Sequence, residues 1–379
     1  MRIAFVYDVI YPYVKGGVEK RIWELSRRLA ARGHDVHVYG MRHWAGPSTI
    51  KSGGITYHGV CRPMGLYKES GRRSIRQALY FTFWLPFSLF RERYDIVDCQ
   101  AAPYLPTMMT RLYSFLTGVP LVVTWHEYWG AYWSRYLGLL GSVGMLLEYV
   151  CARLSDRAFS VSENTRRRLE KMGVKSVDAP NGVDMAYIRD TKPAEESDII
   201  FVGRLIKDKN VDLLIDAVSL VRERNPPLRV IIVGVGPERD RLEKKANNQD
   251  LSHCVEFIGN QPYERVIGLM KSSKAFAFPS TREGFGIVAL EANACGLPVV
   301  TVRHERNAAA DLIEDGANGF VVPPEVKPFA EALLKILQDE KLRKDMYLKS
   351  LNKAAGYDWD KVAGMLEKEY GRILPPPAR

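Results

Sequence analysis

The stretch TREGFGIVALEANACGLPVV, residues 281–300, carries two carboxylates, Glu283 and Glu291. A Gly-Phe-Gly turn stands between them, so we expect a helix to begin near Gly286. Backbone N–H groups at the start of a helix can donate hydrogen bonds to a ligand. Glu291 then lies about a turn and a half into this helix, roughly 80° around its axis from Glu283. We expect the carboxylates to contact different parts of one ligand, and their oxygens suit the hydroxyl pairs of sugars or ribose.

A second cluster, FVGRLIKDKN (201–210), places Arg204, Lys207 and Lys209 directly after an apolar strand. Arginine offers a planar fork and lysine a point charge, so together they can neutralise a diphosphate. The pattern alone is equally compatible with a solvated basic loop. The nearby IIVGVGPERDRL has two glycines of a dinucleotide-binding fingerprint but Arg239 in place of the third, which argues against an oxidoreductase.

Two further candidates lie in the first half of the chain. Gly16 and Gly17 come directly before a predicted helix, where exposed N–H groups and the helix dipole suit a phosphate. His126 follows an apolar strand in VVTWHEYWG. Taken alone, the glycines are equally typical of an ordinary loop, and a single histidine is more often structural.

Strands and helices that must position these residues alternate along the chain. In the first half, strands are expected at RIAFVYD, DVHVYG, YDIVDCQ, PLVVTWH and DRAFSVS, with an amphipathic helix at VEKRIWELSRRLAARG. In the second half, the strands IIFVG, LRVIIVG, VEFIG, KAFAFPS and LPVVTV alternate with helices at 211–224, 237–247, 263–271 and 286–295. This pattern predicts two doubly wound α/β domains with parallel sheets. Ligands bind beyond the carboxyl ends of such strands, so facing domains would place a site in a cleft between them.

Composition narrows the class of protein. The 379 residues are 46% hydrophobic and 26% charged, which is typical of a folded chain long enough for two domains. The five scattered cysteines lack metal-like pair spacing, which argues against a disulfide framework and favours a reducing compartment. The N-terminal MRIAFVYD is typical of a strand and not of a signal peptide, so we expect a cytoplasmic location.

Charge is unevenly distributed. Residues 1–180 hold 25 Lys and Arg against 14 Asp and Glu, a net charge of +11, while the remainder carries 29 against 30, a net charge of −1. The asymmetry favours an anionic partner for the first half: a membrane, a phosphorylated acceptor or nucleic acid. Neither a zinc-finger spacing nor a basic-aromatic RNA-binding signature appears, so we do not expect a nucleic-acid partner.

Two apolar segments stand out in the first half. QALYFTFWLPFSLF (77–90) is flanked by Arg72, Arg73, Arg76 and further arginines, and YLGLLGSVGMLL covers 136–147. Both are shorter than the roughly 18–20 apolar residues of a membrane-spanning helix. A buried core helix and a helix on the membrane surface remain the two alternatives for each segment.

Several motifs together resemble the retaining GT-B glycosyltransferases of family 4. They are GGVE near the N-terminus, SVSENTRRRL, PNGVD, VGRLIKDKN, and EGFGIVALE followed by ANACGLPVV. They occur in the family's order and cover nearly the whole chain. The resemblance implies two Rossmann-like domains, an acceptor-side domain at 1–180 and a nucleotide-sugar-binding domain at 181–360. The segment YDWDKVAGMLEKEY resembles the final helix of this fold, so residues 361–379 are expected to return to the first domain.

Roles for individual residues follow from this resemblance. Arg204 and Lys209 match the pair that binds the donor diphosphate. Glu291 matches the acid that holds the nucleotide ribose, and Glu283 the acid near the reacting sugar. Further matches are His126 near the donor sugar, Gly16 and Gly17 near the phosphates and acceptor, and the Gly284, Phe285 and Gly286 loop at the sugar hydroxyls.

The chain departs from the family pattern at one place. Many relatives have a Gly-Gly-x-x-Glu turn after the next strand, whereas here Asn307 and Ala308 stand at roughly that position. We therefore expect altered sugar contacts there. The base pocket is expected to involve VEFIGNQPY, which does not distinguish adenine, guanine and uracil.

The expected function is metal-independent, retaining transfer of a sugar from a nucleotide-diphosphate sugar, without a further cofactor. Cationic side chains would stabilise the departing diphosphate. A lipid-linked acceptor, with peripheral association on the inner face of the cell membrane, fits the basic and partly apolar first half. Alternatives are a nucleotide-sugar epimerase of the same fold, a catalytically inactive sugar-binding scaffold and a carbohydrate phosphorylase.

Overall fold

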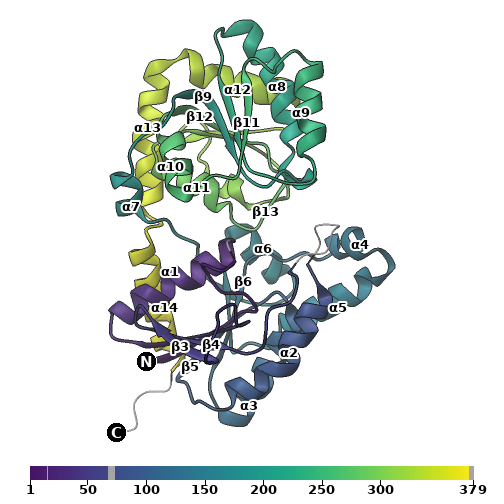
Figure 1. The fold of residues 1–379 in the computed structure, drawn as a ribbon, viewed down its shortest axis with the longest axis vertical. Coiled ribbons are helices and arrows are strands. Elements are labelled where there is room, and N and C mark those ends of the chain that lie inside the picture. The colour runs from purple at the N-terminus through teal and green to yellow at the C-terminus, as the bar shows by residue number, and fades with distance from the viewer. Residues whose placement is uncertain (15, 67–72, 375–379) are drawn as a thin grey trace. The chain divides into compact units, whose positions relative to one another are not determined.

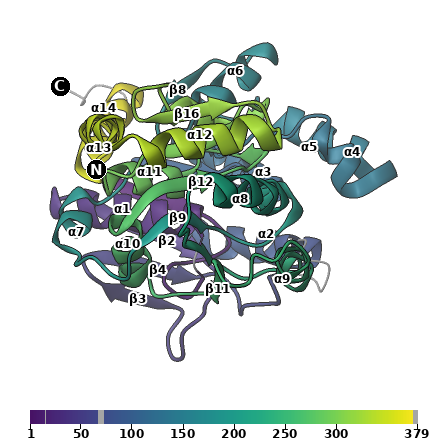
Figure 2. The same ribbon diagram turned by 90° about the horizontal axis from the view of Figure 1, so that it is seen from above.

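The computed structural model describes residues 1–14, 16–66 and 73–374. The chain divides into two compact units, which Figure 1 shows: unit 1 is Met1–Asn181 with Trp359–Arg379, and unit 2 is Gly182–Asp358. Each unit contains a sheet of mainly parallel strands with helices on both sides, as Figures 1 and 2 show. This confirms the predicted doubly wound α/β class.

Unit 1 is built on an eight-stranded sheet in the order β3-β4-β2-β1-β5-β6-β7-β8, parallel except for the β3–β4 pair. Its strands are β1 Arg2–Val6, β2 Asp35–Gly40, β3 Thr49–Ser52, β4 Ile55–Gly59, β5 Ile96–Gln100, β6 Leu121–Trp125, β7 Arg157–Ser160 and β8 Ser176–Asp178. The five strands expected from the sequence are present. The β3–β4 hairpin, which turns at Gly53 and Gly54, and β8 were not predicted.

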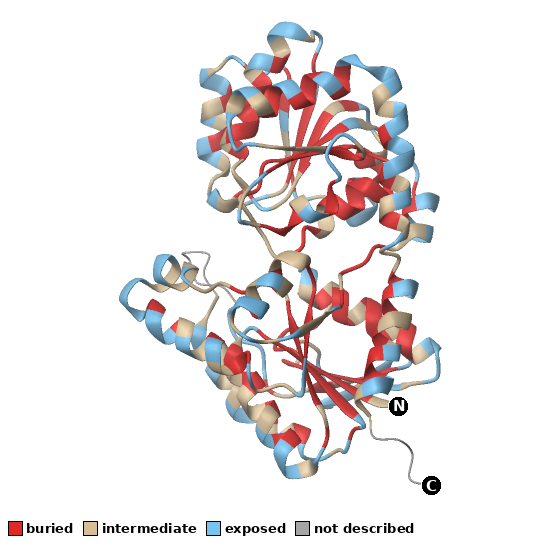
Figure 3. Ribbon diagram, turned by 180° about the vertical axis from the view of Figure 1, so that it is seen from behind, coloured by how far each residue is buried: buried red, intermediate tan, exposed pale blue. Residues whose placement is uncertain are grey.

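Each face of this sheet is covered by its own hydrophobic core. Along β1, Ile3 and Phe5 point to one core, and Ala4 and Val6 to the other, because successive side chains of a strand alternate between faces. Helices α1 and α14 contribute to the first core, and α2, α3 and α5 to the second. Figure 3 shows buried residues concentrated along the strands and the inner faces of helices. Burial on both faces explains why these strands are almost continuously apolar.

The helices of unit 1 occupy the segments between its strands and its C-terminal part. They are α1 Gly17–Ala31, α2 Ile75–Leu89, α3 Tyr104–Thr117, α4 Tyr132–Leu137, the 3-10 turn η1 Gly138–Leu140, α5 Gly141–Cys151, α6 Glu163–Lys171 and α14 Trp359–Ile373. Helix α1 agrees with the predicted amphipathic helix and ends before Gly33, whose φ of 86° favours glycine. Helices α4 and α5 form an arm that projects from the sheet of unit 1 in Figures 1 and 2.

For the apolar segment 77–90, the sequence left open a buried core helix or a helix with an exposed apolar surface. Helix α2 has both features. One face, including Phe81, Leu85 and Leu89, is buried in the core. The opposite face is apolar and exposed: Phe83 has 64% of its surface accessible and Phe87 57%. The helix is therefore both a core helix and the source of an exposed apolar surface. Across the described residues, no helix is long and apolar enough to cross a membrane.

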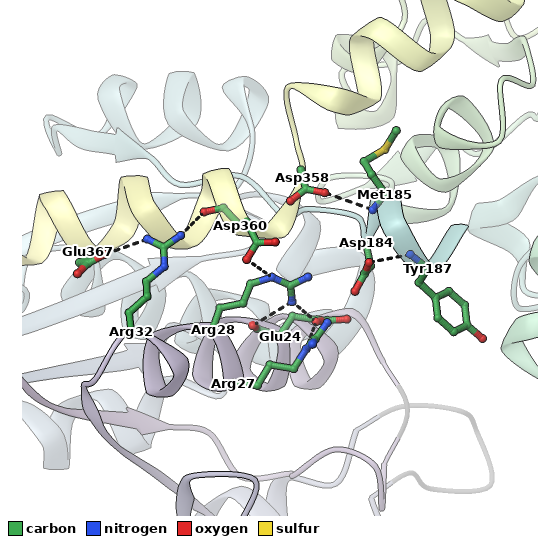
Figure 4. A network of polar contacts seen from close by, with 10 residues as sticks. All are labelled: Glu24, Arg27, Arg28, Arg32, Asp184, Met185, Tyr187, Asp358, Asp360 and Glu367. Carbon is green, nitrogen blue, oxygen red and sulfur yellow. Dashed lines mark hydrogen bonds and ion pairs between the residues drawn. The ribbon is translucent and has the colours of Figure 1, made fainter. Parts of the chain in front are cut away.

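Helix α14 closes unit 1 from the far end of the sequence. Trp359, Leu366 and Tyr370 are buried in the core that also contains α1 residues. Figure 4 shows the polar contacts around this pairing. Arg28 of α1 contacts Asp360 at 3.0 Å, and Arg32 contacts Glu367 at 2.9 Å. Apolar burial and ion pairs thus both attach α14 to α1.

Unit 2 is built on a six-stranded parallel sheet in the order β11-β10-β9-β12-β14-β16. Its strands are β9 Ser197–Val202, β10 Val230–Val233, β11 Val255–Gly259, β12 Ser273–Phe278, β14 Val299–Val302 and β16 Gly319–Val322, and a separate pair joins β13 Arg282–Glu283 to β15 Arg306–Asn307. The five strands predicted for this half are present.

The helices of unit 2 agree with the sequence pattern as well. They are α7 Met185–Asp190, the 3-10 turn η2 Lys207–Lys209, α8 Val211–Arg224, α9 Arg239–Asn248, α10 Tyr263–Lys271, α11 Ile287–Ala294, the 3-10 turn η3 Ala308–Leu312, α12 Val326–Gln338 and α13 Glu340–Ala355. All five cysteines of the chain are free and buried.

Candidate active site

The predicted site residues follow the carboxyl ends of strands in both units. The strand order reverses between β1 and β5 in unit 1, and between β9 and β12 in unit 2. At such a reversal the connecting helices leave for opposite faces, which makes room for a ligand. Gly16 lies after β1 and His126 after β6, while Arg204 and Glu283 lie after β9 and β12. We refer to these two regions as the carboxyl edges of units 1 and 2.

At the carboxyl edge of unit 2, Lys209 and Glu283 form an ion pair. The Lys209 Nζ atom contacts the Glu283 Oε1 atom, and both side chains are largely enclosed, with 15% and 12% of their surface exposed. Lys209 is the last residue of the turn η2, and its ammonium lies 5.2 Å from the centre of the Phe278 ring. Glu283 is held by the pairing of β13 with β15. The structure thus joins two residues that the sequence assigned to different parts of a donor.

Arg204 is exposed at the same edge, directly after β9. The backbone on either side of it lies close to the loop after β10. A Cβ atom on Gly234 would lie 1.9 Å from the Gly203 carbonyl oxygen, and one on Gly236 would lie 2.2 Å from that of Leu205. The two glycines that resemble a dinucleotide fingerprint therefore serve close packing of the Arg204 loop.

Glu291 is buried on α11, with 5% of its surface exposed, and its Oε1 atom accepts a hydrogen bond of 2.9 Å from the Tyr263 hydroxyl. The Tyr263 ring stacks on Tyr187 with 5.5 Å between ring centres. The sequence analysis missed both tyrosines. The only signal was the position of Tyr263 in the VEFIGNQPY segment expected near the base.

The loop before α11 is shaped by its last glycine. Gly286 precedes the helix with a φ of 89°, and a Cβ atom there would lie 2.5 Å from that of Ala309. Both facts require glycine at this position. The Phe285 ring is buried and lies 6.0 Å from the Tyr357 ring, centre to centre. Since that ring is enclosed, the group that Phe285 can offer to a ligand is its backbone, as is true of Gly284.

Asn307 stands roughly where many relatives have glycines, and its side chain forms hydrogen bonds to neighbouring residues of unit 2. Its Nδ2 atom donates to the Thr301 hydroxyl at 3.0 Å and to the Val302 carbonyl at 2.8 Å. Its Oδ1 atom accepts from the Ala309 N–H at 3.2 Å, and only 2% of the residue is exposed. The side chain therefore fixes the loop between β14 and η3.

At the carboxyl edge of unit 1, His126 is hydrogen-bonded to a residue that the sequence analysis missed. The His126 Nε2 atom lies 2.7 Å from the Gln100 Oε1 atom. Gln100 in turn donates from Nε2 to the Asp98 Oδ1 atom at 3.0 Å. Gln100 and Asp98 each have 2% of their surface exposed, and both lie on β5 beside β6. The appearance of polar residues in the apolar strand YDIVDCQ was the available signal.

Asp98 accepts further hydrogen bonds from residues of two other elements. Thr124 of β6 donates to its Oδ1 atom at 2.8 Å, and Tyr370 of α14 donates to its Oδ2 atom at 2.6 Å. Burial raises the pKa of Asp98 to about 6, while these donors and the positive charge of Arg21 act in the opposite direction. The carboxylate is therefore ionised at neutral pH.

Burial, together with the positive charge of Arg21, lowers the pKa of His126 to about 3. Arg21 is 1% exposed, and burial also lowers its own pKa to about 10. The Arg21 Nη1 atom donates to the Asn181 Oδ1 atom at 3.2 Å. His126 is consequently a neutral imidazole over the physiological pH range.

The glycines before α1 accommodate a carboxylate. Gly16 is the N-cap of α1, and a Cβ atom on it would lie 2.5 Å from the Glu19 Oε2 atom. Glu19 is 6% exposed, and burial raises its pKa to about 6. Gly17 is the exposed first residue of the helix. The predicted phosphate-binding turn therefore carries an acid close to its N–H groups.

The expected role of Arg73 at a membrane surface was wrong. It was grouped with the arginines that flank an apolar helix at a membrane surface, but it points into unit 1. Its guanidinium donates to both carboxylate oxygens of Asp8, at 2.8 and 2.6 Å, and to the Tyr7 hydroxyl at 2.8 Å. Gln77 also donates to Asp8, at 3.1 Å. Asp8 is 1% exposed, so Arg73 is paired with a buried carboxylate, while 34% of the Arg73 side chain remains exposed. Arg72 lies outside the described residues.

Two family models match successive parts of the chain. The model described as Glycosyltransferase Family 4 matches residues 15–187, and the model described as Glycosyl transferases group 1 matches residues 188–351.

Relatives match along nearly the full length. The chain is 28% identical over 391 residues to a phosphatidyl-myo-inositol mannosyltransferase from Mycolicibacterium smegmatis, with 98% of this chain and 94% of the relative covered. It is 28% identical over 396 residues to one of the subunits of phosphatidylinositol N-acetylglucosaminyltransferase from Arabidopsis thaliana, with 99% and 82% covered.

Solved structures share the fold. Sucrose-phosphate synthase from Thermosynechococcus elongatus superposes with a TM-score of 0.81 at 18% identity, covering 98% of each chain. HepE from Anabaena in complex with UDP superposes with a TM-score of 0.76 at 19% identity, covering 98% of this chain and all of the other, 100%. At these identities the likeness concerns the arrangement of elements.

Proposed function

Because the chain belongs to glycosyltransferase family 4 and has the GT-B fold, we propose that it transfers a sugar from a nucleotide-diphosphate sugar with retention of configuration. Glycosyltransferase activity is common to the relatives that match along most of the chain. The observation that carries the finer proposal is the Lys209–Glu283 ion pair at the strand reversal of unit 2. It joins a cation suited to a diphosphate to an acid suited to sugar hydroxyls.

Binding of the donor follows from the side chains of this edge. Arg204 is exposed and Lys209 is held close to the end of β9, so their charges can meet a diphosphate. Glu291, buried beside Tyr263, presents a carboxylate to the ribose hydroxyls. The loop of Gly284, Phe285 and Gly286 offers backbone groups to the sugar.

The proposed reaction breaks the bond between the anomeric carbon and the diphosphate oxygen. The acceptor hydroxyl attacks from the same face, and its proton passes to the departing phosphate. Arg204 and Lys209 stabilise the negative charge that develops on the leaving oxygen. Because side chains supply this positive charge, the proposal requires neither a resident metal ion nor a further cofactor. Activity that is lost with EDTA and restored by Mn²⁺ would contradict this point.

The acceptor is proposed to be lipid-linked, and unit 1 to meet an anionic bilayer. Exposed apolar residues run along α2 and the adjacent α3: Ile75, Leu79, Phe83, Trp84, Phe87, Phe90, Leu112, Phe115 and Leu116. We call this set the apolar surface. Helix positions 75, 79, 83 and 87 repeat every four residues and so share one face. The net charge of +11 in residues 1–180 complements an anionic membrane. Two relatives are named for phosphatidylinositol lipids, which is consistent with such an acceptor.

The donor proposal is tested by calorimetric titration of the whole chain with UDP, GDP and ADP. We expect one nucleotide to bind and the corresponding nucleotide sugar to be consumed when an acceptor is present. Conversion of the free nucleotide sugar without acceptor would favour the epimerase instead. Binding without any turnover across donors and lipid acceptors would favour the inactive scaffold.

The membrane proposal is tested by co-sedimentation with phosphatidylcholine vesicles that contain or lack phosphatidylglycerol. We expect binding to the anionic vesicles, with less bound as salt rises. Replacing Phe83 and Phe87 together by serine should reduce the bound fraction, since each residue contributes apolar area to the interface. Leu348→Ser, at an equally exposed position on α13 with 62% accessible surface, is the matched control and should bind as the unmodified chain does. A protein that stays in the supernatant at low salt would refute the membrane contact.

A further inference from the structure

We propose that a pocket in unit 1, apart from the candidate active site, binds the phosphate group of an anionic ligand. Residues of β1, β2, β3, β4 and the end of α2 line this pocket, which has a volume of about 240 Å³. A single water molecule needs only roughly 10–15 Å³. We call it the β3 pocket, after the edge strand of the sheet. It does not include Gly16, Gly17 or His126, and its ligand is independent of the proposed glycosyl transfer.

The β3 pocket has more positive than negative charge. Its charged lining residues are Arg2, Asp35, Lys51, Arg91 and Glu92. Arg2 contacts both acids, Asp35 at 2.9 Å and Glu92 at 2.8 Å. Across the described residues, the side chains of Lys51 and Arg91 form neither a hydrogen bond nor an ion pair. Two cations are therefore left to meet an added anion.

Hydroxyl groups provide further donors in the β3 pocket. Thr56 of β4 is only 6% exposed, and its hydroxyl makes no hydrogen bond within the described part of the chain. The same is true there of the Ser48 and Ser88 hydroxyls, which also line the pocket. A hydroxyl can rotate to donate to a ligand oxygen. Because a nearly buried polar group without a partner is unfavourable, a ligand that accepts from Thr56 would be stabilised.

Two buried histidines complete the lining. The His37 Nδ1 atom lies 2.8 Å from the His58 Nε2 atom, and the His37 Nε2 atom lies 3.1 Å from the Asp35 Oδ2 atom. Since a carboxylate only accepts, His37 carries its proton on Nε2 and accepts from His58 at Nδ1. Burial lowers the pKa of both rings, to about 4 for His58. Both histidines are thus neutral near pH 7, and their signals can report an anion that enters the pocket.

The unpartnered side chains favour a phosphate group over a neutral sugar. Lys51, Arg91 and the three hydroxyls can all donate, and they come from different sides of the pocket. At neutral pH a phosphate group offers acceptor oxygens and negative charge, and both arginine and lysine bind it well. A neutral sugar would leave the two cations uncompensated.

A phospholipid head group is the favoured source of this phosphate, because the pocket borders the apolar surface. Ser88 and Arg91 follow Trp84 and Phe87 by four residues each, so they lie about one turn further along the same rows of α2. Trp84 is 40% exposed and Phe87 57%. A head group in the pocket would leave its acyl chains beside these rings. A soluble phosphate ester would offer the same group without the chains.

The first test detects phosphate at the pocket directly. The whole chain with ¹⁵N-labelled histidine is titrated with inorganic phosphate, which replaces chloride at constant ionic strength, and is followed by nuclear magnetic resonance. Among the seven histidines, we expect the signals of His37 and His58 to shift. The shifts should be lost when Lys51 and Arg91 are both replaced by serine. They should persist in Lys209→Ala, which alters only the proposed diphosphate site of unit 2. Unchanged His37 and His58 signals after all chloride is replaced would overturn the proposal.

The second test separates the two sources of phosphate. Sedimentation with vesicles of phosphatidylcholine and phosphatidylglycerol compares the unmodified chain with the Lys51→Ser/Arg91→Ser double variant. The control is Lys171→Ser/Lys175→Ser, which changes the net charge equally at two exposed lysines near β8, the opposite edge strand of the sheet. We expect the pocket variant to bind vesicles roughly 3-fold to 30-fold more weakly, and the control to lose less.

The remaining outcomes of this comparison are also decisive. A pocket variant that loses the phosphate response but keeps its vesicle affinity would assign the pocket to a soluble phosphate ester. Equal losses of vesicle affinity in the two double variants would refute a lipid head group in the pocket. Nucleotide binding should be retained in both double variants, so failure of the donor proposal would be seen separately, as absent nucleotide binding in the unmodified chain.

Discussion

The carboxyl edges of the two units hold their polar side chains in different ways. In unit 1, His126, Gln100 and Asp98 form a chain of hydrogen bonds whose inner members are only 2% exposed. In unit 2, Lys209 and Glu283 are joined by an ion pair, and Arg204 beside them is exposed. The first arrangement is fixed by burial. The second consists of charged groups that can exchange one partner for another.

This difference predicts different roles for the two edges. A buried carboxylate that loses a donor is destabilised, so we expect the unit 1 edge to keep its geometry when a ligand binds. In the proposed function, Lys209 would leave Glu283 for a diphosphate, because a second anion would compensate its charge. That exchange would release the Glu283 carboxylate for sugar hydroxyls. We therefore expect substitutions at the unit 2 edge to affect donor binding and turnover. Substitutions of the residues that donate hydrogen bonds to Asp98 should affect folding stability.

The largest effect is expected from Glu283→Ala. We expect turnover to fall by about 100-fold or more, a loss of the size seen when a group that stabilises a transition state is removed. Donor affinity should change less, since the acid lies by the sugar and not by the nucleotide. Steady-state kinetics and calorimetry measure the two quantities. Equal losses in turnover and affinity would contradict this role of Glu283 at the sugar.

Lys209→Ala should mainly weaken nucleotide binding. Loss of a charged hydrogen bond of about 1.5–3 kcal/mol predicts a dissociation constant roughly 10-fold to 150-fold higher. Lys274→Ala is the matched control, because Lys274 also forms an ion pair, with Asp198 at 2.8 Å, but lies near the start of β12. Calorimetry with the preferred nucleoside diphosphate should separate the two variants. If they bind nucleotide alike, the assignment of Lys209 to the diphosphate is wrong.

Glu291→Ala should remove a similar charged contact. We expect the free energy of nucleotide binding to weaken by about 1.5–3 kcal/mol. Tyr263→Phe removes only the hydroxyl that donates to Glu291 and should cost about 0.5–1.5 kcal/mol. The same titrations measure both variants. A larger loss for Tyr263→Phe than for Glu291→Ala would assign the ribose contact to the tyrosine.

Tyr370→Phe tests the buried hydrogen bonds around Asp98 in unit 1. Removing the hydroxyl that donates to Asp98 leaves a buried acceptor short of a partner, so the free energy of unfolding should fall by about 1–3 kcal/mol. Nucleotide affinity should not change. Tyr347→Phe, at a position with 47% accessible surface on α13, is the control and should keep full stability in urea titrations. A stable Tyr370→Phe variant with weakened nucleotide binding would reverse the distinction drawn between the units.

The positions of the main helices and strands could be predicted, because their hydrophobic periodicity and the residues that end them indicate the same bounds. The helices at 211–224 and 263–271 coincide with α8 and α10, since amphipathic periodicity and chain breaks agree at both ends. The β3–β4 hairpin was missed although Gly53 and Gly54 carry its turn, with φ of 58° and 78°. Two consecutive glycines between short alternating segments are a hairpin signal, but here the strands are only four and five residues long.

The site was predicted as a set of residues and not as a set of contacts. Glu283 and Lys209 were each identified, but their ion pair joins residues 74 positions apart in the sequence, which no local pattern reveals. Gln100 and Tyr263 were missed because uncharged polar residues have many structural uses. Arg73 was misassigned because its charge is visible in the sequence, whereas the buried carboxylate of Asp8 that binds it is not recognisable as buried.

The attachment of α14 to unit 1 determines when each unit can be completed during synthesis. Unit 2 is one continuous stretch, Gly182–Asp358, that leaves the ribosome before α14 does. Until then, the core that contains Phe5, Ile22 and Leu25 lacks Trp359 and Tyr370. At about 5–20 residues per second, translation of the intervening unit takes roughly 10–35 seconds. For that interval the nascent first unit has an uncovered apolar face and a buried acid without its tyrosine, so completion of its fold depends on α14.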